Sequence, residues 1–142
     1  MANSPGISGA LKQAALSATL DGKAMKAALY LASATTGPTN AVYTVTGEVS
    51  DSGTGYTAGG TSVTNALLAL LTGTTAFWTP SAPIAWTGLT LATPFDAVMI
   101  YSTTDSNRNI GVFTIGSQTV TAGNVTLTMP TNDASTGLVR LA

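Results

Sequence analysis

The chain has 142 residues, a formal net charge of −1, and neither cysteine nor histidine. The missing residue types exclude a thiol nucleophile, a Ser-His catalytic triad and a Cys/His zinc site. Five basic residues are too few for broad electrostatic binding to nucleic acid. The longest apolar run, residues 66–71, is far shorter than the roughly 20 residues that span a bilayer. We therefore expect neither a nucleic acid nor a membrane as a partner.

The first 22 residues differ from the rest and predict one short helix over residues 8–19. Either Ser4-Pro5 or Ser8 suits the start of a helix, the segment after Ser8 is rich in helix formers, and an Asp-Gly pair follows as a stop signal. Ile7 and Leu11 lie on its apolar face at helical spacing. The segment is either a helix packed on the chain's own sheet, or an arm that docks on a neighbour with Ile7 and Leu11 as candidate contacts.

From residue 24 onward the pattern predicts a series of short β-strands separated by turns. Strands are expected at residues 24–32, 42–46, 62–71, 75–79, 84–91, 96–102, 110–115, 118–121 and 125–129, with 137–141 as a further edge strand. The polar segment 103–109 predicts a hairpin turn. Residues 23–142 are therefore expected to form one all-β domain, an antiparallel β-sandwich with a jelly roll as the preferred topology.

Charged residues make up only 8% of the chain, against roughly 25% in a typical soluble domain. The polar residues are mainly Thr, Ser, Asn and Gly, and threonine loses little side-chain entropy when a partner covers it. A net charge near zero also favours association. We expect much of the surface to be covered by copies of the chain or by a larger assembly; a Thr-rich β-domain without such a partner is the alternative.

The Gly-rich segment 51–60 is not a convincing phosphate-binding loop, because no Lys-Ser/Thr pair and no strand–turn–helix context accompany it. Its glycines are better explained as positions that need positive φ or a close backbone approach. If the loop meets a neighbouring protein, Tyr56, Gly59 and Gly60 are its candidate contacts.

Glu48 and Asp51 are the closest candidates for a carboxylate pair or, with loop carbonyls, for a Ca²⁺ site. Neither the facing arrangement of a glycosidase nor the spacing of an EF-hand is indicated. We therefore predict that the chain is not an enzyme and has no catalytic residues, no cofactor and no metal site.

The large aromatic residues divide into two groups. Phe77, Phe95 and Phe113 are expected to fill the core. Trp78 and Trp86 flank a proline-containing loop and are either core residues or partly exposed contacts for a partner, since tryptophan often anchors protein interfaces.

Several sequence runs carry a family resemblance: ALYLAS at 28–33, GEVS at 47–50, GTGYTAGG at 53–60, FDAVMIY at 95–101 and LVRL at 138–141. In this order they resemble small virion proteins of tailed bacteriophages, and most closely the jelly-roll capsid cement, or decoration, proteins of short-tailed phages. The resemblance covers residues 24–141, and GTGYTAGG is its most distinctive motif.

The resemblance implies a non-enzymatic structural protein on the outer surface of an icosahedral phage capsid, where it cements neighbouring capsomers against internal pressure. The expected partners are the major capsid protein and further copies of the chain, as a dimer rather than a trimer, with synthesis in the host cytoplasm. No catalytic residue is implied, so the contact residues proposed above rest on physical reasoning alone. A receptor- or glycan-binding module of a phage fibre or tail is the alternative.

Overall fold

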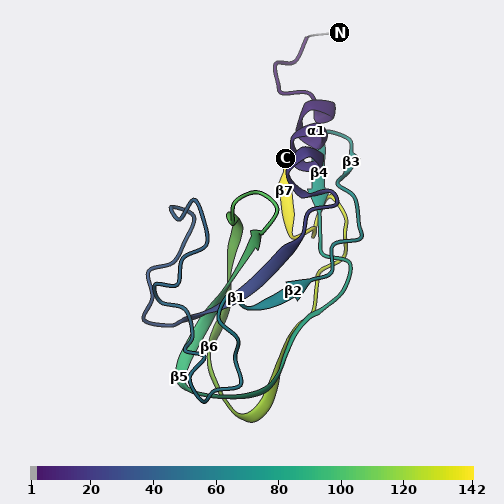
Figure 1. Cartoon of the computed structure of the whole chain (residues 1–142). Coiled ribbons are helices and arrows are strands. Elements are labelled where there is room, and N and C mark those ends of the chain that lie inside the picture. Colours follow the sequence, from purple (N-terminus) through teal and green to yellow (C-terminus); the bar gives the residue numbers. More distant parts are fainter. Residues whose placement is uncertain (1–2) are drawn as a thin grey trace. The chain divides into compact units, whose positions relative to one another are not determined.

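The computed structural model describes residues 3–142 (Figure 1). The chain folds into two compact units. The first unit, called the helical unit here, comprises Met1–Gly22, Asn65–Ser81 and Met129–Ala142. The second, called the hairpin unit, comprises Lys23–Thr64 and Ala82–Thr128. Each unit contains its own antiparallel sheet.

The helical unit combines helix α1 (Gly9–Leu20) with a three-stranded sheet in the order β3 (Leu70–Thr72), β4 (Thr75–Trp78), β7 (Val139–Leu141). Both strand pairs are antiparallel. In this order β7, the last strand of the chain, lies at one edge of the sheet.

Helix α1 begins where Ser8 caps it, because the Ser8 hydroxyl accepts a hydrogen bond of 3.2 Å from the Leu11 N–H. Its first residue, Gly9, lies against the β3–β4 turn, and a Cβ at this position would stand 2.9 Å from the Leu71 side chain and 3.0 Å from the Gly73 carbonyl. A glycine is therefore required where the helix meets the turn.

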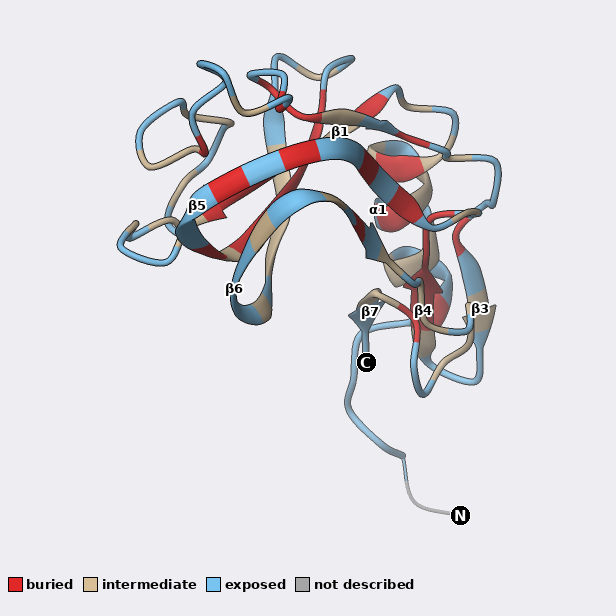
Figure 2. Cartoon of the chain, turned by 90° about the horizontal axis from the view of Figure 1, so that it is seen from below, coloured by how far each residue is buried: buried red, intermediate tan, exposed pale blue. Residues whose placement is uncertain are grey.

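The hairpin unit contains a four-stranded antiparallel sheet in the order β2-β1-β5-β6. Its strands are β1 (Met25–Leu31), β2 (Thr61–Val63), β5 (Ile84–Ser102) and β6 (Arg108–Leu127). β5 and β6 form one long hairpin whose ladder is interrupted by several register shifts. Such bulges bend and twist a ribbon, and Figure 2 shows both strands strongly curved.

The core of the hairpin unit lies where β1 pairs with the second half of β5. Leu29, Val98 and Ile100 are at most 1% exposed. Tyr30 and Met99 belong to a second buried cluster, because alternate residues of a strand point to opposite faces of its sheet. Nearer its start, β5 alternates between buried and exposed residues, as Figure 2 shows.

The all-β class, the two antiparallel sheets and the short N-terminal helix are confirmed. The helix predicted at 8–19 lies one residue further along the chain, and the polar turn before residue 108 joins β5 to β6. The jelly-roll topology stays a prediction. The two compact units divide residues 23–142 between them, since 65–81 and 129–142 group with the helix. The predicted division into an N-terminal segment, residues 1–22, and one domain, residues 23–142, stays a prediction.

Several predicted strand boundaries were wrong. Residues 84–91 and 96–102 lie in one strand, and 110–115, 118–121 and 125–127 lie in another, because the breaks between them are register shifts within one long hairpin. Segment 62–71 forms two short strands rather than one long run. In segment 42–46, Val42 forms only an isolated bridge to Arg108.

Candidate functional site

The Gly-rich loop is held to the hairpin unit by the carboxylate of Glu48. Oε1 of Glu48 accepts hydrogen bonds of 2.7 Å from the Tyr56 hydroxyl and 2.7 Å from the Gly59 N–H. Oε2 accepts one of 2.5 Å from the Tyr43 hydroxyl. These three donors engage Glu48, one of the two acids considered above as a carboxylate pair, whereas the other, Asp51, is exposed. The two residues do not form a facing pair of free carboxylates.

Two further tyrosine contacts extend this network into the sheet. The Tyr56 hydroxyl accepts a hydrogen bond of 3.0 Å from the Leu29 N–H of β1, and the Tyr101 hydroxyl donates one of 2.7 Å to the Gly59 carbonyl. The ring of Tyr101 also stacks on Tyr43, with 4.6 Å between ring centroids. The loop is thus anchored from β1, from β5 and from the preceding segment.

Burial in this network changes the acidity of the tyrosines. Burial raises the pKa of Tyr30 to about 12, and the negative charge of Glu48 adds to the rise. Burial and then the hydrogen bond to Glu48 raise the pKa of Tyr43 and Tyr56, and burial raises that of Tyr101. All four hydroxyls are therefore neutral donors at ordinary pH.

The loop glycines have the backbone roles expected of them. Gly60 has a φ of +78°, and a Cβ at this position would collide with the carbonyl oxygen of Ala27. Gly59 has a φ of +85° and lies under the Tyr101 hydroxyl. Gly55 adopts a φ of +74°, and a Cβ there would meet the carbonyl oxygen of Gly88. These contacts lie within the chain, and both Gly59 and Gly60 are buried.

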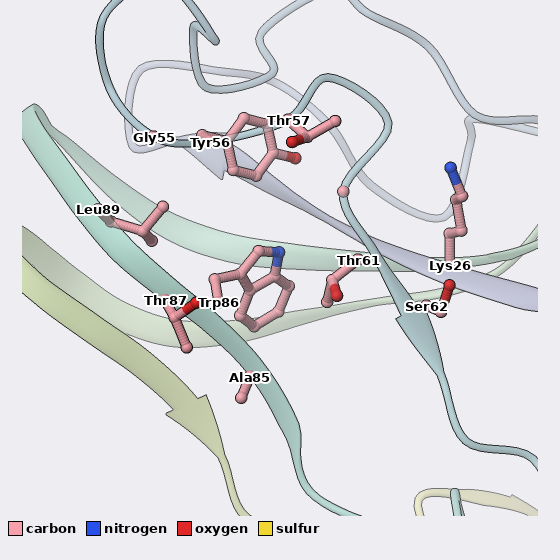
Figure 3. A pocket seen from close by; sticks show the side chains of 11 residues that line it. Lys26, Gly55, Tyr56, Thr57, Thr61, Ser62, Ala85, Trp86, Thr87 and Leu89 are labelled. Carbon is pink, nitrogen blue, oxygen red and sulfur yellow. The ribbon is translucent and has the colours of Figure 1, made fainter.

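A pocket of about 320 Å³ lies between the Gly-rich loop, the start of β2 and the first half of β5 (Figure 3). Trp86 extends toward it from β5, and its Nε1–H has no hydrogen-bond partner in the described part of the chain. The lining is mostly polar: Lys26 supplies a positive charge, and the hydroxyl groups belong to Tyr56, Thr57, Thr61, Ser62 and Thr87. This lining suits a small group that carries acceptor oxygens.

Of the two alternatives for Trp78 and Trp86, the structure shows the core position, and Tyr56 is buried as well. Tyr56, Trp78 and Trp86 are 3%, 0% and 5% exposed, since each fills space between packed elements. Trp78 Nε1 donates to Asn65 Oδ1 at 3.1 Å, which satisfies its polar atom inside the helical unit. Their role in partner contact stays a prediction, but the side chains are not presented at the surface.

Among the phenylalanines, two of three expectations are confirmed. Phe77 and Phe95 are buried, at 4% and 0% exposed. Phe113 is only half-buried, because β6 is the last strand of its sheet and has a neighbour on one side only.

Ile7 and Leu11, the candidate contacts of the N-terminal segment, are exposed to 64% and 63%. Four leucines of the same helical unit are also more than one third exposed: Leu67, Leu68, Leu70 and Leu141. All four lie in predicted strands, three of them in segment 62–71 and Leu141 in segment 137–141, and their exposure was not predicted. No local signal indicated this exposure, because a continuous apolar run such as residues 66–71 is typical of a buried strand.

In the described residues, no three acidic, histidine or cysteine side chains lie close enough to hold a metal ion. No helix in the same range has the length and apolar character needed to cross a membrane. Comparison with known proteins found no matching family model, no matching curated protein and no matching solved structure.

Proposed function

We propose that this chain is a structural virion protein that binds the outer surface of an icosahedral phage capsid and cements neighbouring capsomers. The observation that carries the proposal is the concentration of exposed large apolar side chains in the helical unit. Ile7, Leu11 and Leu68 are each at least 60% exposed. Exposed apolar surface beyond scattered single residues is typical of interaction sites, and the presence of six such residues in one small unit supports a docking element.

The scarcity of charge supports the same proposal. Charged residues are 8% of the chain, so few ions lose their hydration when a partner covers the surface. One close ion pair joins Lys23 to Asp105 at 3.3 Å. An interface of standard size buries roughly 1,600 Å², and many copies around a closed shell reinforce one another through a high effective concentration. Clamping of this kind requires geometry and apolar contact rather than a reaction.

The alternative, a receptor- or glycan-binding module, is favoured by the pocket beside Trp86 and its hydroxyl lining. Sugar binding usually uses an exposed aromatic face for stacking, but Trp86 is 5% exposed and Trp78 is fully buried. We therefore favour the structural role. A glycan array probed with the whole chain separates the two: specific hits that Trp86→Phe abolishes would support the alternative.

The test of the structural role is a particle-binding assay. Particles assembled without this chain are incubated with purified protein, and bound copies are counted by quantitative mass spectrometry. We expect saturation at hundreds of copies per particle and greater resistance of the particles to heat and osmotic shock. Saturation at a handful of copies, or no binding, would overturn the proposal.

A pair of variants tests whether the helical unit makes the contact. Leu11→Lys and Leu68→Lys place a charge at exposed apolar positions of the helical unit, whereas Val45→Lys does so at a 70% exposed position of the hairpin unit. All three proteins are expected to fold. The first two should bind particles at least about tenfold more weakly, since a buried unpaired charge costs well over 1.4 kcal/mol, while Val45→Lys should bind normally.

A further inference from the structure

From residue 110 onward the outer edge of β6 is a long row of backbone groups without a neighbouring strand, whereas the Asn109 N–H just before it donates to the Ala41 carbonyl. β6 is the last strand of its sheet, and among the described residues no backbone hydrogen bond joins 110–127 to any segment except β5. Only Val125 of this strand is buried. Proteins normally protect such edges with charge, proline or a covering segment, yet residues 109–127 contain neither a charged residue nor a proline.

One stretch of this edge is regular enough to pair with another strand. From Ala97↔Thr114 to Ile100↔Gly111 the β5–β6 register is continuous. It is bounded on one side by the register shift at Ile100/Tyr101 and on the other by the shift beyond Ala97. Pairing with a further strand is therefore expected between residues 111 and 114.

The direction of each backbone group in β1 follows from the hydrogen bonds of Leu29. Its N–H donates to the Tyr56 hydroxyl and its carbonyl accepts from the Val49 N–H, so both groups point away from β5. Successive residues of a strand direct their backbone groups to opposite sides. Ala28 and Tyr30 consequently face β5, where their register partners are Met99 and Ala97.

The same alternation carries across β5 to β6. Because Met99 faces β1, Val98 and Ile100 face β6 and bond their register partners Phe113 and Gly111. Gly111 and Phe113 therefore direct their backbone groups toward β5. Val112, which lies between them, and Thr114, which follows Phe113, direct their N–H and carbonyl groups to the open edge. The regular stretch thus offers two outward-facing residues separated by Phe113.

We propose that β6 pairs antiparallel with β6 of a second copy of this chain, about a two-fold axis at Phe113. In this register Val112 of each copy exchanges backbone hydrogen bonds with Thr114 of the other, and every outward-facing group of the stretch is satisfied. The two Phe113 side chains lie directly opposite each other, which covers a ring that is half-exposed in the single chain. A two-fold contact uses the same edge of both copies, so association stops at a dimer.

Gly111 supports this placement of Phe113. A Cβ at Gly111 would lie 2.8 Å from Cζ of Phe113, so the ring rests over the glycine on the same face of the sheet. The ring is thus held along β6, beside the two-fold axis. The second copy is the favoured occupant because Val112 and Thr114 are spaced symmetrically on either side of Phe113, so that the edge is complementary to itself and needs no foreign sequence.

The register is tested by cross-linking, since the chain has no cysteine of its own. Opposed residues in the non-hydrogen-bonded pairs of an antiparallel ladder have Cα atoms roughly 4.5 Å apart, within the range of a disulfide. Phe113→Cys should therefore form disulfide-linked dimers when the native protein is oxidised. Thr114→Cys is the matched control, because its two copies lie beyond about 7 Å and should not be linked.

Absence of cross-linking in native Phe113→Cys, or equal cross-linking of both variants, would overturn this register. A second measurement covers the case in which Phe113→Cys does not fold. Thr114→Pro removes an outward N–H but no bond to β5, and edge strands tolerate proline where the N–H faces outward. Thr114→Ala keeps the N–H and is its control.

Sedimentation equilibrium of the isolated chain measures the outcome without any capsid, so it is independent of the proposed function. We expect a monomer–dimer equilibrium for the wild type and for Thr114→Ala. The dissociation constant of Thr114→Pro should be about tenfold higher or more, because the two-fold axis doubles each lost hydrogen bond. A wild-type chain that is monomeric at all concentrations would overturn the proposal. This holds also if the β6 edge pairs with a strand of another protein instead.

Discussion

The hydroxyl of Tyr56 lies 2.7 Å from Oε1 of Glu48 and 3.0 Å from the backbone nitrogen of Leu29. A single buried side chain therefore joins the Gly-rich loop to the central strand β1, donating to the carboxylate and accepting from the strand. A loop that by composition looks flexible is fixed by this contact.

Replacing Tyr56 with Phe removes the hydroxyl and leaves the Leu29 N–H without its partner. A buried unsatisfied group costs about 1–3 kcal/mol, and we expect the free energy of unfolding to fall by about this amount in urea titrations. Tyr43→Phe is the matched control, because it removes one hydrogen bond to the same carboxylate but orphans no strand donor. Equal losses in the two variants would contradict the anchoring role of Tyr56.

Replacing Gly60 with Ala should destabilise the chain severely, since its Cβ meets the backbone of β1 at a positive φ. Gly53→Ala separates the two causes: its φ is +71°, but a Cβ there meets nothing within 4 Å. We expect Gly53→Ala to lose only the conformational cost of about 1–2 kcal/mol, and Gly60→Ala to lose clearly more. Thermal unfolding followed by circular dichroism makes the comparison, and a Gly60→Ala protein as stable as Gly53→Ala would refute the collision.

Alkaline pH should destabilise the fold through the buried tyrosines. The pKa of Tyr30 rises from 10.0 to about 12 in the folded chain. The folded state therefore keeps its proton where the unfolded state loses it. The resulting stability is fully present below pH 10 and is lost between about pH 10 and 12. Urea unfolding at increasing pH should show this decline, and Tyr30→Phe should make it shallower. A pH-independent stability across this window would contradict the direction of the shift.

Lysine at Trp86 distinguishes a core position from a surface position. Trp86 is 5% exposed, so Trp86→Lys buries an unpaired charge and leaves a void, and we expect the free energy of unfolding to fall by at least about 3 kcal/mol. Leu68→Lys, at a 60% exposed leucine, should change it by no more than about 0.5 kcal/mol. Chemical denaturation of both variants provides the test, and a stable, folded Trp86→Lys protein would show that the indole is not part of the core.

Features that depend on neighbouring residues were predictable from the sequence. Ser8 specifies the start of the helix because its hydroxyl caps the first turn. The alternation around Tyr30 and the polar segment before Arg108 indicated a strand and a turn. The positive φ of Gly59 and Gly60 was one of the two backbone roles expected of the loop glycines. The network around Glu48 was not predictable, since its donors come from segments whose packing no local pattern specifies.

The sequence by itself thus determined the all-β class, the N-terminal helix, the scarcity of charge and the glycine positions, because short-range sterics and side-chain chemistry decide these. Only the tertiary structure decided which apolar residues are covered: it buried Trp78 and Trp86, left Leu68 exposed and placed Phe113 on an open edge. The physical reason is that burial depends on which strand becomes the neighbour of which, and this is set by contacts between residues far apart in the chain.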